Sequence, residues 1–232
     1  MGTELLPMVF TSGWASGINA YAVVLVMGLA GRFFSIDLVP HVLTRTDVLV
    51  AAAVLFLLEM FADKIPYLDS VWDGVHTFVR PAVGATLGYL LAGHEGSGLE
   101  QAFAAATGGF SALASHGVKA GIRAGVNASP EPVSNVAISS AEDVAVIGVM
   151  TLATEHPWAA AAVAGVLLLA GIVAVVWLLR RIARLKRRYD DWGTGAGRAD
   201  PSKVSAPGWQ RPRASRSTGS SCRSAAPERP RP

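Results

Sequence analysis

The stretch "WAAAAVAGVLLLAGIVAVVWLL", residues 158–179, decides the fold, because it is an unbroken run of 22 apolar residues. A helix of about 20 apolar residues is long enough to cross the roughly 30 Å hydrocarbon core of a bilayer. Trp158 and Trp177 lie near the two ends of the run, where aromatic rings favour the headgroup layer. The stretch therefore predicts a transmembrane helix.

The whole chain has the composition of a membrane protein. Of its 232 residues, 51% are hydrophobic and 16% are charged, and the mean hydropathy is +0.40, whereas about a quarter of the residues of a soluble domain are charged. Residues 180–232 contain 14 Lys and Arg against 4 Asp and Glu, a net charge of +10. Residues 1–179 contain the other 6 Lys and Arg against 13 Asp and Glu, a net charge of −7. The membrane part is therefore acidic, and the basic residues gather behind it.

A basic cluster, "RRIARLKRR" at residues 180–188, directly follows the apolar run. By the positive-inside rule this end of the chain is expected in the cytoplasm, with the protein crossing the cell membrane several times. Basic residues beside a membrane also attract anionic lipids, at about 1 kcal/mol each. The residues expected to contact lipid headgroups are Arg180, Arg181, Arg184, Lys186, Arg187 and Arg188. The alternative is a cluster that fixes the topology and binds no particular lipid.

The chain is expected to divide into a transmembrane domain, residues 1–188, and a tail, residues 189–232. The tail is rich in Gly, Pro, Ser and Arg, and such a segment buries too little apolar surface to fold, so a disordered cytoplasmic tail is predicted. Cys222, the only cysteine, lies in it. An internal disulfide is therefore excluded.

Before the last span, five further helices are expected, at residues 14–34, 47–63, 70–92, 99–128 and 133–154. The predicted fold is an all-α, polytopic transmembrane bundle of about six membrane helices. The third or the fourth helix is re-entrant in an alternative reading, because the third has only about a dozen continuous apolar residues after Pro81. With six crossings both termini are cytoplasmic, and Lys64, Arg80, Lys119 and Arg123 fall on the cytoplasmic side.

Two segments of the chain resemble each other. "FTSGWASGINA" at residues 10–20 matches "FSALASHGVKA" at residues 110–120, and each is followed by a segment with a pair of acids and then by an apolar helix entered near a proline. Two such units of three helices predict an inverted repeat of three plus three, an architecture that many transporters use.

Polar side chains recur at helical spacing inside the predicted membrane helices. The candidate residues for binding an ion or substrate are Glu59, Asp63, Asp73, His76, Arg80, His116, Lys119, Arg123, Asn127, Asn135, Glu142 and Asp143. A charge that faces lipid costs a few kcal/mol, so the polar stripes are expected to turn toward one another, with acids opposite bases. Gly17, Asn19, Pro66 and Pro81 are candidates for helix packing and gating.

Several of these residues also have a structural interpretation. Asp63 stands close to Pro66 and is able to mark a helix end at the membrane interface. Ser70 with Asp73 has the spacing of an N-terminal capping box. Lys119 and Arg123 serve as topology charges in this view. For Glu59 and Glu142, which lie well inside apolar sequence, the functional interpretation is the favoured one.

Three blocks carry a family resemblance: "GWASGINAY", "LEMFADKIPYLDSVWDGVHTFVRP" and "HGVKAGIRAGVNASPEPVSNVAISSAEDV". They resemble the bacterial integral membrane family catalogued as domain of unknown function 4126, over roughly residues 10–180. The resemblance implies a polytopic membrane protein and brings no established activity. The residues that match the family's pattern include Gly17, Asn19, Asp69 and most of the charged candidates.

The favoured function is a small transporter or channel-like protein that moves an ion, a proton or a small polar solute by means of its buried carboxylates. The alternative is a non-transporting scaffold or assembly factor, with structural polar stripes and a basic tail that binds lipid or a partner. An intramembrane hydrolase would use Glu59, His116 and the pair Glu142 and Asp143 around a metal or a water molecule, but no spacing of metal ligands supports it. We expect no enzymatic activity, no cofactor, no bound metal and no nucleic-acid partner. A homo-oligomer is compatible with the sequence.

Overall fold

The structure is a computed structural model that describes residues 3–34, 36, 38–93, 97–127 and 132–197. Within these ranges, the side chains of residues 66, 67, 69, 70, 126, 127, 132, 134, 135 and 188–197 lie outside the description. The predictions for the side chains of Pro66, Asp69, Asn127, Asn135 and Arg188, and for Cys222 and residues 198–232, therefore fall outside the described residues.

The described residues form helices throughout, which confirms the all-α prediction. The elements are α1 (Leu5–Phe34), a short 3-10 helix η1 (His41–Thr44), α2 (Thr46–Ala62), α3 (Pro66–Ala92), α4 (Gly98–Asn127), α5 (Pro132–Glu155) and α6 (Pro157–Gly197). Three of them contain stretches long and apolar enough to cross a membrane: Leu5–Phe34, Val136–Glu155 and Pro157–Arg187. A polytopic membrane bundle follows from this combination of elements.

The helix boundaries differ from the predicted ones at two starts. α1 begins at Leu5, ahead of the predicted residue 14, and α3 begins at Pro66, ahead of the predicted residue 70. Proline is favoured in the first turn of a helix because its missing N–H has no intrahelical partner there. Ser70 is consequently inside α3, and the interpretation of Ser70 and Asp73 as a capping box is wrong.

Two compact units make up the chain, Met1–Arg184 and Leu185–Pro232. In the first unit α1 is the central helix, because it packs against α2, α3, α4 and α5. α3 and α4 form the most extensive helix pair. They approach closely at Gly84 and Gly108, where an added Cβ on either residue would strike the backbone of the other helix. Small residues of this kind let helix backbones come together in membranes.

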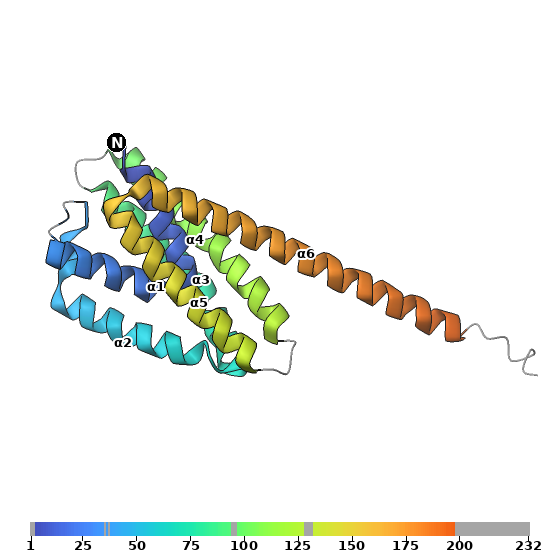
Figure 1. Ribbon diagram of the computed structural model, residues 1–232. Helices are drawn as coiled ribbons and strands as arrows, with labels where there is room; N and C mark the ends of the chain where they lie inside the picture. Colours follow the sequence, from blue (N-terminus) through green and yellow to red (C-terminus); the bar gives the residue numbers. More distant parts are fainter. Residues whose placement is uncertain (1–2, 35, 37, 94–96, 128–131, 198–232) are drawn as a thin grey trace, which may run out of the picture. The chain divides into compact units, whose positions relative to one another are not determined.

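α1 is broken in the middle. Asn19 has the extended backbone angles φ −147° and ψ 96°, while the residues on both sides are helical. Figure 1 shows the two halves of α1 running in different directions. The break leaves backbone groups without helical partners in the centre of the first unit, where they must find other ones.

α6 is the helix that contains the deciding apolar run, and only 6% of its most apolar window is buried inside the protein. Its outward side chains are aliphatic and aromatic, among them Leu169, Val173 and Trp177. An exposed surface of this composition suits the lipid phase of a membrane. The helix continues to Gly197. The inverted repeat stays a prediction.

Candidate functional site

The polar side chains of five helices meet inside the first unit in what we call the ion network. It comprises Asn19 of α1, Glu59 of α2 with Asp63 at its C-cap, Asp73 and Arg80 of α3, His116, Lys119 and Arg123 of α4, and Glu142 and Asp143 of α5. All are buried except Glu142, which is partly exposed. The structure thus brings the predicted acids and bases together in the interior of the bundle.

Arg80 joins three helices through its guanidinium group. Nη2 donates to Glu59 Oε1 at 2.5 Å, and Nη1 donates to Asp73 Oδ1 at 3.0 Å. Nη1 also lies 2.7 Å from His116 Nδ1. A guanidinium only donates hydrogen bonds, so His116 Nδ1 accepts. α2, α3 and α4 are therefore linked through one cation.

This contact fixes the tautomer of His116. Because Nδ1 accepts, the hydrogen of the neutral ring is on Nε2, which lies 3.0 Å from Thr77 Oγ1. The Thr77 hydroxyl in turn donates to the Asp73 carbonyl oxygen at 3.0 Å. Neutral His116 is thus held by a donor on one side and an acceptor on the other.

His76 connects α3 to α1 beside the network. Its Nδ1 lies 2.8 Å from the Trp72 carbonyl oxygen, which can only accept, so Nδ1 carries the hydrogen. Nε2 then accepts from the Tyr21 hydroxyl at 3.0 Å. The Tyr21 and His76 rings meet edge to face, with centroids 5.7 Å apart.

Lys119 and Arg123 share Asp63. The Lys119 ammonium donates to Asp63 Oδ2 at 2.7 Å and lies 3.9 Å from Glu59 Oε1 and 3.8 Å from Glu142 Oε2. Arg123 Nη2 is 3.2 Å from the same Asp63 oxygen and 2.9 Å from Glu142 Oε2. Arg123 Nη1 also donates to the Asp63 carbonyl oxygen at 2.8 Å. The end of α2 is thereby fixed to α4 and α5.

The break in α1 supplies further hydrogen-bond partners to the ion network, for Asp143 and Lys119. Asn19 Oδ1 accepts from the Ala22 N–H at 2.9 Å, so Asn19 caps the second half of the helix. Asn19 Nδ2 donates to Asp143 Oδ1 at 3.0 Å. The Ile18 carbonyl oxygen, which the break frees, accepts from Lys119 Nζ at 3.0 Å. Both ends produced by the break therefore point into the ion network.

Negative charge exceeds positive charge in the ion network. It contains five carboxylates, Glu59, Asp63, Asp73, Glu142 and Asp143, against the three cations Arg80, Lys119 and Arg123. Five minus three leaves two negative charges when all five carboxyl groups are ionised and His116 is neutral. Glu59 Oε2 is fully buried and has no hydrogen-bond partner among the described residues. A buried carboxylate oxygen is normally hydrogen-bonded, so the network has unused capacity for positive charge or protons.

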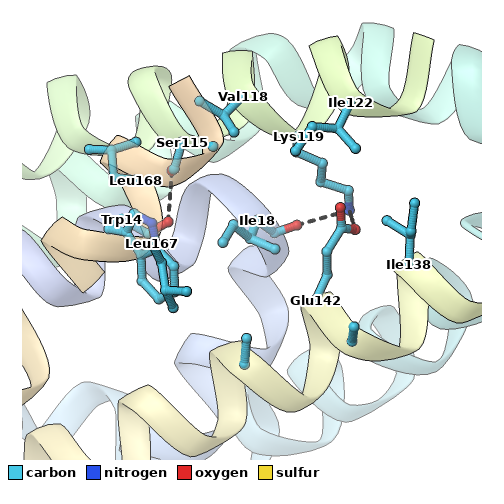
Figure 2. A pocket seen from close by; sticks show the side chains of 13 residues that line it. Trp14, Ile18, Ser115, Val118, Lys119, Ile122, Ile138, Glu142, Leu167 and Leu168 are labelled. Carbon is cyan, nitrogen blue, oxygen red and sulfur yellow. Dashed lines mark hydrogen bonds and ion pairs between the residues drawn. The ribbon is translucent and has the colours of Figure 1, made fainter. Parts of the chain in front are cut away.

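A cavity of about 330 Å³ adjoins the network between α1, α4, α5 and α6. Its lining residues are Trp14, Ile18, Ser115, Val118, Lys119, Ile122, Ile138, Ala141, Glu142, Ala145, Leu167, Leu168 and Gly171. Figure 2 shows Lys119 and Glu142 reaching toward each other from α4 and α5, while Trp14 and Leu168 line another part of the wall. The Glu142 side chain is 16% exposed. Lys119 and Glu142 therefore bring charged groups of the network to the wall of a cavity that is otherwise lined mostly by apolar side chains.

The helix-packing candidates have separate positions. Gly17 lies against α4, because an added Cβ would fall on Ser115 Oγ and on the Ala112 carbonyl oxygen. Pro81 lies inside α3, and its carbonyl oxygen faces Gly109 of α4. Asn19 is the residue at the break in α1.

The basic residues that were predicted as candidates fall into a buried group and an exposed group. Arg80, Lys119 and Arg123 are buried among carboxylates, so the interpretation of Lys119 and Arg123 as topology charges that reach the surface is wrong. The residues of the basic cluster with described side chains, Arg180, Arg181, Arg184, Lys186 and Arg187, are exposed. The Arg181 guanidinium lies over the Trp177 ring, 5.2 Å from its centroid.

Sequence reasoning missed four contributors to this region: Tyr21, Trp72, Thr77 and the Ile18 carbonyl group. Thr77 carries the clearest signal, because it stands one helical turn after Asp73 and adjoins His76. The Ile18 carbonyl has no side-chain signature, since only the backbone break at Asn19 makes it available. Within the described ranges, no group of three or more His, Cys, Asp and Glu side chains is arranged to hold a metal ion.

Comparison with known proteins gives one result. The family model described as "Domain of unknown function (DUF4126)" matches residues 6–179, which include the ion network, the cavity and the apolar run of α6. No curated protein and no solved structure matches the chain.

Proposed function

The chain belongs to the family described as domain of unknown function (DUF4126), and from the ion network we propose that it is a small membrane transporter or channel-like protein for an ion, a proton or a small polar solute. The observation that carries the proposal is a group of four buried carboxylates and the partly exposed Glu142 against three buried cations among the described residues, with Glu142 also lining a cavity. Excess negative charge in a low-dielectric interior favours uptake of a cation or a proton. A cation or proton is therefore the favoured cargo within this class.

Lys119 supplies the moving part of the proposed mechanism. Its ammonium is within 4 Å of the three carboxylates of Glu59, Asp63 and Glu142. A small displacement of a flexible lysine side chain exchanges one carboxylate for another. The incoming charge would enter at Glu142 and pass toward Glu59 as Lys119 changes partners.

The membrane setting is part of the proposal. The protein spans the cell membrane several times, and its C-terminal end faces the cytoplasm, where the basic cluster contacts anionic headgroups. The exposed side chains of Arg180, Arg181 and Arg184 directly after the apolar run support this orientation. The proposal assigns the protein no catalytic reaction and no cofactor.

Flux through proteoliposomes tests the proposal. Purified protein is reconstituted, and proton and monovalent-cation flux is measured under an imposed gradient for the wild type, Glu59→Gln and Glu142→Gln. Each variant removes a carboxylate that would bind the cation or take up the proton, so each is expected to abolish most of the flux. Glu155→Gln, at an exposed position on α5, is the matched control and keeps wild-type flux. Wild-type flux in both network variants would refute the proposal.

A scaffold is the second candidate, and the extensive mutual pairing of the ion network favours it, since Arg80 and Arg123 each join carboxylates of two helices. In that case the network only holds the helices together, and the basic tail predicted at residues 189–232 recruits a partner or lipid. Deletion of residues 198–232 separates the two functions. A scaffold loses its cellular phenotype with this deletion, whereas a transporter keeps its flux.

A further inference from the structure

The cavity beside the ion network has an apolar body and a charged part. Its volume of about 330 Å³ is at the lower end of the range of small-molecule sites, about 300–1,000 Å³. Trp14 and Leu168 lie on one part of its wall (Figure 2). Lys119 and Glu142 bring their charged groups to another part. Apolar walls with a few polar groups that fix orientation are the usual composition of a site for a small organic ligand.

Glu142 has an unused acceptor at the charged part of the wall. Arg123 Nη2 lies 2.9 Å from Glu142 Oε2, and the Lys119 ammonium lies 3.8 Å from the same oxygen. The other oxygen, Oε1, accepts no hydrogen bond from the described residues and is not fully enclosed by protein. Glu142 Oε1 is therefore open to a donor from a ligand in the cavity.

The charges around Glu142 favour a cationic ligand. The ion network has five carboxylates against three cations, so it has an excess of negative charge when its carboxyl groups are ionised. Lys119 is buried, and its ammonium donates to the Ile18 carbonyl oxygen and to Asp63 Oδ2. Because these protein partners hold the ammonium, an anion gains little from Lys119. A cation in this low-dielectric surrounding is attracted by the excess charge.

We propose that the cavity binds a small alkyl amine, whose ammonium group donates to Glu142 Oε1 and whose hydrocarbon part lies against the apolar wall beside Trp14. The inference rests on the proposed function and names its substrate class. A hydrogen bond between an ammonium group and a carboxylate is roughly twice as strong as one between neutral groups. The hydrocarbon part gains free energy in proportion to the apolar area that it removes from water.

α6 separates the cavity from the lipid by a single helix. Leu168 and Gly171 of α6 line the cavity, whereas Leu169 and Val173 of the same helix are exposed. A ligand with an apolar body dissolves in the lipid beside α6, because transfer of apolar surface out of water is favourable. A strongly hydrated ion does not. The position of the cavity therefore also favours an amine with an apolar body.

Thermal unfolding in detergent tests the proposal. The full-length protein is titrated with hexylamine, 1-hexanol and sodium hexanoate at pH 7 and equal ionic strength. The three probes share one hydrocarbon chain, and only hexylamine is cationic at this pH, as the lysine side chain is. A ligand that binds only the folded state raises the unfolding midpoint in a saturable way. We expect hexylamine to act at about tenfold lower concentration than 1-hexanol, since hydrogen bonds to charged groups contribute more, and hexanoate to have no saturable effect.

Three variants locate the ligand. Glu142→Gln keeps the shape of the side chain and removes its charge, so hexylamine and 1-hexanol should then act at equal concentrations. Ala145→Leu places a larger side chain in the cavity wall and should remove the saturable response to both probes. Ala137→Leu is the same change at an exposed position of α5 outside the cavity and should respond as the wild type does. The Ala145→Leu curves also measure the effect of each probe on the detergent.

Each contrary outcome overturns the proposal in a different way. Equal action of hexylamine and 1-hexanol on the wild type would show that the cavity takes apolar molecules without recognising charge. Saturable stabilisation by hexanoate would assign the polar contact to Lys119 in place of Glu142. A wild-type response in Ala145→Leu would place the ligand outside the cavity. If Glu142→Gln does not fold, the three probes on the wild type and the two leucine variants still decide.

The binding test is independent of the flux measurement. Saturable, charge-dependent binding of hexylamine to a protein without cation or proton flux keeps the site and removes the proposed function. Cation or proton flux in a protein that does not bind hexylamine removes the site and keeps the proposed function.

Discussion

Arg80 on α3 and Glu59 on α2 form an ion pair that is fully enclosed by protein: Arg80 Nη2 lies 2.5 Å from Glu59 Oε1, and both side chains are 0% exposed. Asp73 lies 3.0 Å from the other terminal nitrogen of the same guanidinium. Arg80 therefore compensates two carboxylates from two helices. Its removal would leave both of them buried without this cation.

Substitution Arg80→Met is expected to destabilise the protein by about 3–5 kcal/mol, because breaking a buried pair leaves an uncompensated charge. The double variant Arg80→Met/Glu59→Met should lose less than the sum of the two single variants, since it removes both partners. Thermal unfolding in detergent measures these differences. Arg45→Met is the control: Arg45 pairs with Asp47 at 2.7 Å, but both side chains are 63% exposed, so no measurable change is expected. Similar losses at Arg80 and Arg45 would contradict the role of burial.

Gly17→Ala is expected to destabilise the contact between α1 and α4 by about 1–3 kcal/mol, the usual cost of overpacking. The new methyl group would fall on Ser115 Oγ and on the Ala112 carbonyl oxygen, so the two backbones would have to separate. Gly117→Ala, on the helix that Gly17 faces, meets nothing within 4 Å and should gain up to about 1 kcal/mol from helix propensity. The midpoints of thermal unfolding should therefore move in opposite directions. A neutral Gly17→Ala would show that the helices do not pack at this distance.

Asn19→Ala is expected to cost about 1–2 kcal/mol through the lost helix cap, and more through the lost donor to Asp143. Hydrogen exchange of the Ala22 amide should accelerate, since its acceptor is Asn19 Oδ1. Asn19→Asp keeps an acceptor for Ala22 but places a second carboxylate beside Asp143. It should therefore protect the Ala22 amide better than Asn19→Ala while unfolding at a lower temperature at neutral pH. An Ala22 amide that exchanges equally in all three proteins would exclude the cap.

Cys222 is a natural reporter for the orientation of the C-terminal end, because the chain has no other cysteine. A membrane-impermeant maleimide should label it in inside-out vesicles and leave it unlabelled in intact cells. Replacement of Arg180, Arg181 and Arg184 by Gln should weaken this preference, since these cations directly follow the apolar run. Labelling of Cys222 in intact cells would refute the cytoplasmic assignment.

The sequence was sufficient to predict the helical class and the convergence of the charges. An unbroken apolar run specifies a membrane helix by its length alone. Charges such as Glu59 and Lys119 cannot face lipid without a large cost, so their burial against one another follows from helical spacing. This prediction requires only that a charge facing lipid has a large unfavourable free energy. It does not depend on any detail of the structure.

The break in α1 could not be predicted in the same way. Asn19 adopts its extended conformation in contact with Asp143, which is 124 residues away in the chain, and the freed Ile18 carbonyl meets Lys119 after 101 residues. A local sequence pattern has no information on such partners. The same limit explains why the capping-box interpretation of Asp73 was wrong. Asp73 has the spacing of a helix cap with Ser70, but its carboxylate accepts a hydrogen bond from Arg80, seven residues later.

The buried cations also show why a count of Lys and Arg residues in the sequence is a poor guide to membrane orientation. Arg80, Lys119 and Arg123 fitted the count of cytoplasmic charges, yet each is no more than 3% exposed. A lysine or arginine contributes to topology when it reaches the membrane surface. The predicted orientation therefore depends on the exposed basic cluster within α6, at residues 180–188.

The ion network also has a consequence for biosynthesis. Glu59 and Asp63 leave the ribosome before the residues that neutralise them, since Arg80 is on the next helix and Lys119 and Arg123 are on the one after it. A nascent chain that ends before α4 would expose these acids to lipid at a cost of a few kcal/mol each. We therefore expect the early helices to be held at the translocon or beside a chaperone until α4 and α5 are synthesised, so that the middle of this protein enters the bilayer as a group.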